Sequence, residues 1–398
     1  MPNFSDHKKH IFAMIEAAVA AVDPFKSTYK ALRIDGELIK AAGAHLDCSS
    51  GRTYLVGIGK AAVPMANAAI DKLGDRLDSG VVVTKKGQTE LAKHDDVQTH
   101  FAAHPVPDES SVTAADAVIE LLEKTQPEDV VLFLISGGAS ALCTRPLLSM
   151  ERWQTLSQDL LASGCTIQEF NTVRKQLDAV KGGGLGELAA PAKIATLVLS
   201  DVIGNPIDMI GSGPTVPNPQ PPADALAILQ KYSIQNDEAF QLLESLQQTE
   251  VDFDSPFKFV GDLPIATAAA CQAAKELGYE AHVVSTTLEG EAKKVGEMAV
   301  EKAKTLAAGT CLIYGGETTV TIQGDGIGGR NQELALSAAI GLDGIENTII
   351  ATYATDGDDG PTNAAGAIVN GGSVKAGKIK DLEAADFLAN NDSYTYFN

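Results

Sequence analysis

Hydrophobic residues in the first half of the chain gather in short continuous runs rather than in a regular alternation. The runs lie at residues 54–58, 81–84, 130–135 and 194–199. Runs of this kind are typical of parallel strands that are buried on both faces. Stretches with helical spacing, at 61–73 and 112–124, separate some of these runs, so strands and helices alternate. The pattern predicts an α/β fold with a mostly parallel sheet.

The second half of the chain resumes this alternation after a polar stretch. Residues 214–222 are rich in Pro and Asn, 224–246 has the pattern of one long helix, and 247–254 is polar and reads as a linker. Further helices are expected at 265–277 and 289–307, and strands at 282–285, 310–314, 319–322 and 348–353. We therefore predict a first domain over residues 1–248 and a second, smaller α/β domain over residues 249–398.

Composition narrows the class of protein. A length of 398 residues exceeds one ordinary core, and 52 acidic against 31 basic residues give a net charge of −21. That charge argues against nucleic-acid and anionic-membrane partners, but not against a small anionic substrate. Five scattered cysteines without CxxC spacing indicate reduced thiols rather than zinc or disulfides. Residues 10–22 fit an amphipathic helix and not a signal peptide, so we expect a cytoplasmic protein. We also expect a monomer or a homodimer.

Five glycine-rich turns carry a charged or hydroxyl residue, several of them where a predicted strand ends. They are Gly57–Lys60, Ser136–Ser140, Lys181–Gly184, Gly315–Thr318 and Gly326–Arg330. Glycine lets backbone N–H groups approach an anion without a side chain in the way. A helix that begins at such a turn adds the positive end of its dipole. Together the turns suggest a site that holds phosphate and a small carboxylate.

The first turn has two interpretations. Gly57-x-Gly59-x-x-Ala62 after a strand fits the relaxed dinucleotide-binding pattern, which makes an NADP-linked reductase a competing function. The acidic ribose ligand expected about 20 residues later is missing, although Lys85 and Lys86 could read a 2′-phosphate. Lys60 near a helix start opposes the helix dipole. It is either a solvated surface lysine or, as we favour, a cation directed at a bound anion.

The next two turns supply most of the candidate binding residues. Ser136–Ser140 follows the most hydrophobic strand, at the end where open α/β sheets bind ligands, unless it is only a tight turn. Three consecutive glycines are entropically costly, so Lys181–Gly184 indicates close approach by a ligand or by another backbone segment. The predicted binding residues from these turns are Gly59, Ser136, Gly137, Gly138, Ser140, Lys181, Gly182 and Gly183.

Acidic and basic residues at other predicted strand or helix ends complete the candidate site. Asp201 ends the run 194–199, where it could bind Mg²⁺, accept a proton from an alcohol, or merely cap a helix. Arg330 suits two-pronged binding of carboxylate or phosphate, unless it pairs with Glu333. Asp356 lies in an acidic loop and is either a second Mg²⁺ ligand or part of a hydrated turn. Glu317, which follows two glycines, is a further candidate binding residue.

Read in order, these stretches resemble the glycerate 2-kinase family, whose C-terminal part is called the MOFRL domain. In the first half the matching residues are Val56–Ala62, His104–Asp108, Ser136–Leu142, Asn171–Lys175, Lys181–Leu185 and Leu199–Val202. In the second half they are Gly315–Thr319, Gly328–Glu333 and Thr355–Gly360. The likeness covers nearly the whole chain. One difference is that family members continue into a Thr/Gly-rich tail, whereas this sequence ends at Asn398.

The resemblance implies a fold and an activity. It implies two α/β domains, the first Rossmann-like and the second with its own topology, and an active site in the cleft between them. It implies transfer of phosphate from ATP, with Mg²⁺, to the 2-hydroxyl of D-glycerate. The important lysine and arginine of the family fall on Lys60 and Arg330. Members are often labelled hydroxypyruvate reductases, so that activity and plain sugar-acid binding remain the alternatives. We also expect ligand binding to close the two domains by a hinge at 247–254.

Overall fold

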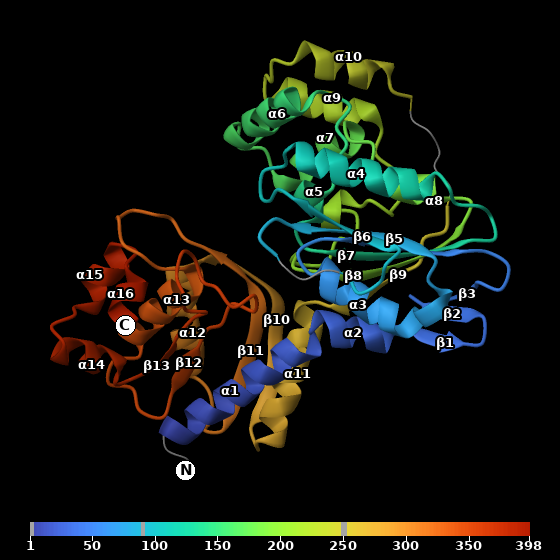
Figure 1. Ribbon diagram of the computed structural model, residues 1–398. Helices are drawn as coiled ribbons and strands as arrows, with labels where there is room; N and C mark the ends of the chain where they lie inside the picture. Colours follow the sequence, from blue (N-terminus) through green and yellow to red (C-terminus); the bar gives the residue numbers. More distant parts are fainter. Residues whose placement is uncertain (1–3, 89–91, 248–252) are drawn as a thin grey trace. The chain divides into compact units, whose positions relative to one another are not determined.

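The computed structural model describes residues 4–88, 92–247 and 253–398, and its contacts divide the chain into two compact units (Figure 1). The larger unit is Val22–Asp262, and the smaller unit combines Met1–Ala21 with Leu263–Asn398. The boundary expected between residues 248 and 249, and most of the expected linker, lie outside the described residues. The contacts place the change of unit later, because strand β9 (Phe257–Gly261) still pairs with the sheet of the larger unit.

The N-terminal helix also differs from the expected division. Helix α1 (Phe4–Ala21) belongs to the smaller unit, where it packs against helix α11 (Leu263–Glu276). Met14 of α1 is buried with Cys271 and Ala274 of α11. A helix with one apolar stripe needs a partner surface, and sequence order does not say which surface that is.

The larger unit is built on a six-stranded sheet whose strands all run parallel. Besides β9, its strands are β4 (Thr53–Ile58), β5 (Ser79–Lys85), β6 (Val97–Ala102), β7 (Val130–Ser136) and β8 (Lys193–Leu199). Their order is β6-β5-β4-β7-β8-β9, so the chain winds outwards in both directions from β4 and β7. This is the Rossmann-like order that the resemblance implied, with its switch point between β4 and β7.

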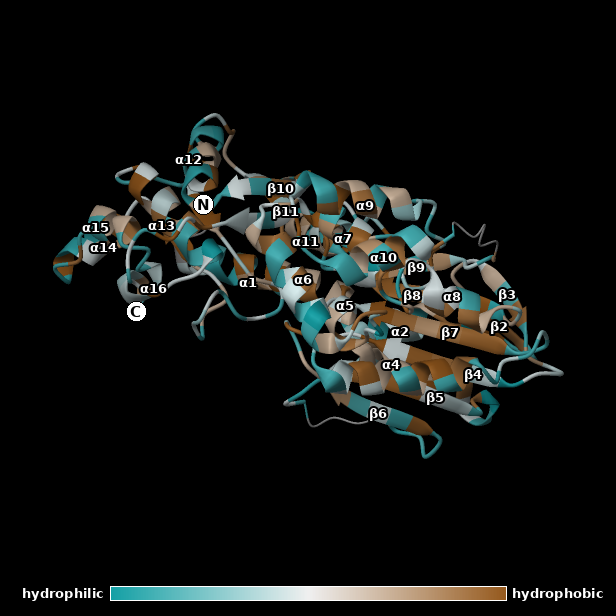
Figure 2. Cartoon of the chain, turned by 90° about the horizontal axis from the view of Figure 1, so that it is seen from above, coloured by the Kyte–Doolittle hydropathy of each residue, from teal (hydrophilic) through white to brown (hydrophobic). Residues whose placement is uncertain are grey.

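Both faces of this sheet are covered, which explains the continuous hydrophobic runs. Every residue of β4 and β7 is buried, whereas the edge strand β6 is partly exposed; in Figure 2, β7 is correspondingly brown along its length. Val56 and Phe133 face the core under α4 (Glu109–Leu122), α5 (Ala139–Leu142) and α8 (Gly184–Ala189). Leu55 and Leu132 face α3 (Ala62–Leu73) and the β1–β3 meander. That meander comprises β1 (Arg33–Asp35), β2 (Leu38–Ala41) and β3 (Ala44–Asp47), and follows α2 (Pro24–Ala31).

Four further helices of the larger unit form a separate hydrophobic cluster around Trp153. They are α6 (Met150–Ala162), α7 (Ile167–Gln176), α9 (Pro222–Lys231) and α10 (Asp237–Ser245). The prediction of one helix over 224–246 is wrong, because a turn separates α9 from α10. Ser233 adopts a left-handed φ of 53° after α9, and the Asn236 side chain accepts from the Ala239 N–H to begin α10.

The smaller unit is a second α/β arrangement. Strands β10 (Glu280–Glu291) and β11 (Thr310–Thr319) pair in parallel, and β12 (Ile349–Ala351) pairs antiparallel with β13 (Ile368–Asn370). Its remaining helices are α12 (Ala292–Ala303), α13 (Arg330–Gly341), α14 (Ser373–Ile379), α15 (Ala384–Ala389) and α16 (Ser393–Phe397). The separate strand expected over 319–322 does not form, because β11 extends to Thr319, which pairs with Glu291 of β10 after two shifts in register. Among the described residues, no helix has the length and hydrophobicity needed to cross a membrane.

Candidate active site

A small pocket lies in the larger unit where strands β6, β7 and β8 end. Its volume is about 230 Å³. It is lined by His104, Pro105, Gly137, Gly138, Ser140, Ala141, Arg174, Asp201, Val202, Met209, Ile210 and Gly211. Carboxyl ends of parallel strands next to a switch point are where open α/β sheets bind ligands. Two of the predicted features therefore contribute to one site: the Ser136–Ser140 turn, through Gly137, Gly138 and Ser140, and the strand end at Asp201.

The Lys60 turn is held against the two adjacent strands, β5 and β7, by three hydrogen bonds. The Gly59 N–H donates to the Val83 carbonyl at 3.0 Å, and the Lys60 N–H donates to the Gly137 carbonyl at 2.9 Å. The buried Ser136 hydroxyl accepts from the Ala61 N–H at 3.1 Å. Gly59 has a φ of 134°, and a Cβ there would overlap Ser136 Oγ. Gly59 and Ser136 thus fit together to fix the turn from which Lys60 projects.

Glycines after β7 let three polar side chains approach the turn. A Cβ at Gly137 would overlap the Asp201 carboxylate. A Cβ at Gly138, whose φ is 84°, would lie 3.1 Å from Cδ2 of His104 and 3.2 Å from Cγ of Lys60. Lys60, His104 and Asp201 therefore surround the Gly137–Gly138 turn. In the part of the chain that the structure describes, neither Lys60 nor Asp201 forms a salt bridge.

His104 is a titratable residue of the pocket that is not among the site residues predicted from the sequence. Partial burial, followed by the positive charges of Lys60 and Lys85, lowers the pKa of its imidazole, and Asp201 opposes this shift. The ring is consequently neutral near pH 7, when it can accept a proton. Two features indicate a role for His104: it follows shortly after strand β6, and it lies in the stretch His104–Asp108 that matches the family.

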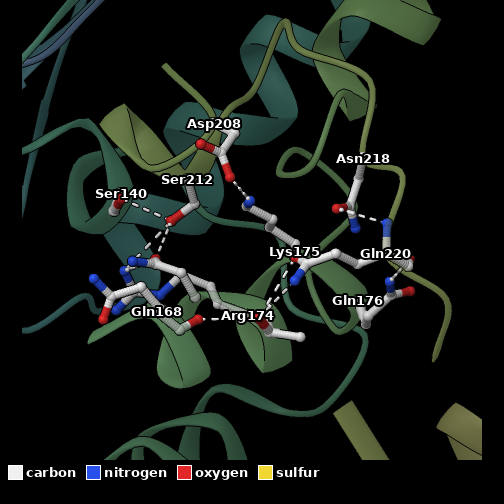
Figure 3. A network of polar contacts seen from close by, with 11 residues as sticks. Ser140, Gln168, Arg174, Lys175, Gln176, Asp208, Ser212, Asn218 and Gln220 are labelled. Atoms are coloured by element: carbon white, nitrogen blue, oxygen red, sulfur yellow. Dashed lines mark hydrogen bonds and ion pairs between the residues drawn. The ribbon is translucent and has the colours of Figure 1, made fainter. Parts of the chain in front are cut away.

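Arg174 is a second residue of the pocket that was not predicted from the sequence. It lies near the end of α7, and its guanidinium carbon sits 4.3 Å from the ring centre of Phe170. Its Nη1 donates to Asn171 Oδ1 at 3.4 Å and to Ser212 Oγ at 3.5 Å, as Figure 3 shows for Ser212. Burial lowers the pKa of Arg174 to about 10, with Asp178 opposing the shift. No salt bridge to Arg174 is formed by the described residues.

The Lys181–Gly184 turn contacts backbone rather than the pocket. The Gly182 and Gly183 N–H groups donate to the carbonyls of Ser212 and Gly213 at 2.9 and 2.7 Å. The buried Lys181 ammonium donates to the carbonyls of Ala139 and Cys143, and burial lowers its pKa. Lys181, Gly182 and Gly183 are absent from the pocket lining, and their contacts support the interpretation that a second backbone segment required these glycines.

Arg330 begins helix α13 in the smaller unit and forms an ion pair with Glu317 of β11, not with Glu333. Both side chains are nearly half exposed. The first turn of α13 is capped by the buried Asp359, whose carboxylate accepts from the N–H groups of Asn331 and Gln332 at 3.0 and 2.8 Å. Arg330 therefore projects from a firmly anchored helix end.

The acidic loop of the smaller unit divides between two roles. Asp359 is used as the cap of α13, whereas Asp356 is exposed in a turn. No group of three or more His, Cys, Asp or Glu side chains suited to a metal ion occurs among the described residues. Asp201 and Asp356 belong to different units, so their pairing as Mg²⁺ ligands stays a prediction.

Comparison with known proteins identifies the family. Residues 10–247 match a family described as a domain of unknown function, DUF4147, and residues 310–398 match the MOFRL family. D-glycerate 2-kinase of Thermotoga maritima is 44% identical over 86% of this chain and 84% of its own length. A crystal structure of glycerate kinase from the same organism has a TM-score of 0.89 at 39% identity, covering 98% of this chain and 94% of that one.

A third similar protein carries a different name. It comes from Agrobacterium vitis, is named provisionally as a hydroxypyruvate reductase, and is 38% identical over 87% of this chain and 82% of its own length. The two family matches, the Thermotoga relative and the shared fold agree with the ordered motifs found in the sequence. The chain belongs to the glycerate 2-kinase family.

Proposed function

We propose that this protein transfers the γ-phosphoryl group of ATP to the 2-hydroxyl of D-glycerate, giving 2-phosphoglycerate and ADP. The observation that carries the proposal is the pocket at the switch point of the sheet, where Asp201 and His104 lie beside Lys60 and the Gly137–Gly138 turn. The pocket holds a proton acceptor for an alcohol, and Lys60, which is not one of the lining residues, lies against the same turn as a cation for a phosphoryl group. The names of the relatives support the same reaction.

The size of the pocket favours the three-carbon acid as its occupant. A volume of about 230 Å³ lies below the roughly 300–1,000 Å³ typical of sites for larger ligands. A small hydroxy acid fits such a space. We therefore assign this pocket to glycerate and the transferring phosphoryl group.

Phosphoryl transfer depends mainly on positioning and on neutralising charge. Asp201, with its carboxylate against Gly137, would accept the proton of the 2-hydroxyl, and the neutral His104 is the alternative acceptor in the same pocket. Lys60 would neutralise the transferring group. Arg330, which begins α13 in the smaller unit and pairs with Glu317, is our second candidate cation for a phosphate or carboxylate group.

Asp201 also suits a Mg²⁺ ion that accompanies ATP. Mg²⁺ is usually held by one or two carboxylates together with substrate phosphates and water, rather than by a complete cage of protein ligands. A carboxylate without a salt bridge at the edge of the pocket fits that requirement. When bound, the ion would neutralise the charge on the phosphates.

The reductase alternative rests on the Gly57-x-Gly59 turn and on the name of the Agrobacterium relative. In dinucleotide sites the second glycine lets the backbone approach a pyrophosphate. Here Gly59 is required by its contact with Ser136, so the motif has a packing explanation. Lys86, a candidate reader of a 2′-phosphate, instead pairs with Asp108 at 2.7 Å.

One pair of assays decides between these functions. Purified protein is incubated with D-glycerate, ATP and Mg²⁺, and the product is identified by ³¹P NMR, which separates 2- from 3-phosphoglycerate. We expect ADP and 2-phosphoglycerate in equal amounts, and neither when ATP or the divalent ion is omitted. Oxidation of NADPH by hydroxypyruvate at a rate equal to or above the ATP reaction would overturn the kinase assignment.

A further inference from the structure

Arg174 is a charged group in an unusual setting. Its side chain lines the pocket and is only partly accessible, yet no described carboxylate lies within salt-bridge distance of it. Other basic residues nearby do have partners: Lys175, the next residue, pairs with Asp208 at 2.6 Å, and Arg145 pairs with Asp116 at 2.7 Å. Keeping a partly desolvated cation without a counter-ion costs free energy. Unlike the buried Lys181, which donates to two backbone carbonyls, Arg174 lines a pocket that the negative charge of a ligand can enter.

The surroundings of Arg174 hold it in place with neutral groups. The Phe170 ring stacks against it, and Asn171 and Ser212 accept from one end of the guanidinium. Ser212 is itself fixed, because its hydroxyl donates to Asn171 Oδ1 at 2.9 Å. It also lies 2.9 Å from the Ser140 hydroxyl, a contact drawn in Figure 3. The described residues provide no acceptor for Nε and Nη2 of Arg174. The guanidinium is therefore positioned, with N–H groups available for a two-pronged contact.

Ser212 shows that this position is maintained against a conformational cost. It is fully buried and adopts a left-handed φ of 62°, between Gly211 and Gly213, which are also left-handed. A non-glycine residue in that region is conformationally strained, and such strain concentrates at binding sites. The strained serine places the hydroxyl that links Ser140, Asn171 and Arg174.

The pocket also carries charge of the opposite sign. Asp201 and Arg174 both line it. A ligand carboxylate is repelled by Asp201 and attracted by Arg174, whereas a ligand hydroxyl is a donor to Asp201. A 2-hydroxy acid bears these two groups on adjacent carbons, so the pocket charges define one orientation for it.

We propose that the Arg174 guanidinium binds the carboxylate of the substrate and so selects three-carbon 2-hydroxy acids over their neutral analogues. This inference rests on the proposed function for the identity of the substrate. Ser140, through Ser212, positions Arg174. The carboxylate anchor thereby lies in the same unit as the proton acceptor.

The test compares the complete wild-type chain with Arg174→Gln and Arg174→Lys. Arg152→Gln is the control, because Arg152 is also an arginine of this unit but forms an exposed ion pair with Glu238. Steady-state kinetics are measured with D-glycerate and with glyceramide, its neutral amide, at saturating ATP and Mg²⁺. Loss of a two-pronged contact to a charged group should raise KM for D-glycerate about 100-fold in Arg174→Gln, and the preference for D-glycerate over glyceramide should fall similarly.

The split between the kinetic constants separates binding from a structural effect. We expect kcat within a few fold of wild type, because the carboxylate contact is present in both the ground state and the transition state. Arg174→Lys should recover part of the loss, and Arg152→Gln should behave as wild type. Thermal melting identifies any variant that fails to fold, in which case Arg174→Lys decides. An unchanged KM and an unchanged preference in the folded variant would overturn the proposal.

Direct binding distinguishes failure of the anchor from failure of the kinase assignment. Calorimetry with D-glycerate alone, without ATP, should show binding to the wild type that weakens in Arg174→Gln. If the wild type binds D-glycerate in this Arg174-dependent way but phosphorylates nothing, the anchor stands and the kinase assignment fails. If phosphorylation is normal and neither assay depends on Arg174, the kinase assignment stands and the anchor fails.

Discussion

The two units each place a cation directly after a glycine turn, but they support it differently. In the larger unit the Lys60 turn is bonded to adjacent strand ends, through Val83, Ser136 and Gly137. In the smaller unit the turn before Arg330 is bonded to the C-terminal segment: Asn391 Oδ1 accepts from the Gln323 and Gly324 N–H groups, and Asp392 accepts from the Ile327 N–H.

The cations themselves also differ. Lys60 forms no salt bridge among the described residues, whereas Arg330 is paired with Glu317. A similar sequence feature thus yields, among the described residues, a cation on an anchored turn without an ion-pair partner in one unit and a cation with a partner in the other. We infer that Lys60 is ready to meet an anion, and that Arg330 must exchange Glu317 for one. The following predictions test that difference.

The largest effect is expected from Lys60→Ala. Removing one preorganised charge next to a developing anion lowers turnover about 100-fold or more. The melting temperature should stay close to that of wild type, because the Lys60 side chain is exposed. Lys30→Ala, which removes an exposed charge from α2, is the control for net charge. Turnover within a few fold of wild type would return Lys60 to an ordinary surface lysine.

A smaller loss is expected from Arg330→Lys. Lysine keeps the charge but lacks the planar fork that binds phosphate or carboxylate at two points, so kcat/KM should fall on the order of tenfold or more. Glu317→Gln should release Arg330 from its ion pair and leave kcat/KM equal to or above that of wild type. A loss of activity in Glu317→Gln as large as that in Arg330→Lys would show that the pair itself is the working arrangement.

Titration of His104 tests whether Lys60 acts on the pocket in the free protein. The positive charge of Lys60 contributes to the lowered pKa of the imidazole, so Lys60→Ala should move that pKa upward, towards the ordinary histidine value. Imidazole NMR signals followed against pH provide the measurement. In the wild type, activity should decline as pH falls through this lowered pKa, because the ring becomes charged. An unchanged pKa in Lys60→Ala would place the Lys60 ammonium away from His104.

The smallest effect concerns the helix that carries Arg330. Glu333 of α13 is buried, and burial raises the pKa of its carboxyl. Its Oε2 accepts from Asn391 Nδ2 at 2.9 Å, while Oε1 has no described hydrogen-bond partner. Because the folded-state pKa is raised, the stabilising contribution is complete below the ordinary glutamate pKa and is lost as pH rises through the folded value.

Glu333→Gln removes that dependence, since the amide keeps one acceptor for Asn391 and carries no charge. The melting temperature at pH 7 should rise by roughly 2–4 °C, and the difference should vanish near pH 4, which differential scanning calorimetry can measure. Glu301→Gln, on the exposed face of α12, is the control. Gln332→Glu is unsuitable because Gln332 donates to the Asp359 carboxylate that caps α13. A less stable Glu333→Gln at pH 7 would contradict the burial argument.

Local pattern was sufficient for the central strands and for the position of the Lys60 turn. Strands β4 and β7 are buried on both faces, so their residues had to be hydrophobic throughout. It was insufficient for β9, whose short mixed segment is recognisable only by its pairing with β8, and for α1, whose partner helix begins more than 200 residues later. The break between α9 and α10 was missed because Ser233 is not a residue that usually marks a left-handed turn.

The order of residue types along the chain is enough to indicate which segments can be buried strands and where glycine allows the chain to turn, because both properties depend on neighbouring residues. The role of each turn depends instead on the distant segments that fold against it. Gly137 and Gly138 admit Asp201, His104 and Lys60, whereas Gly182 and Gly183 donate to a second backbone segment. Likewise, Arg330 forms an ion pair with Glu317, whereas Arg174 has no carboxylate partner among the residues that the structure describes. A side chain's counter-ion and desolvation depend on which distant residues pack around it, and sequence neighbours carry no record of them.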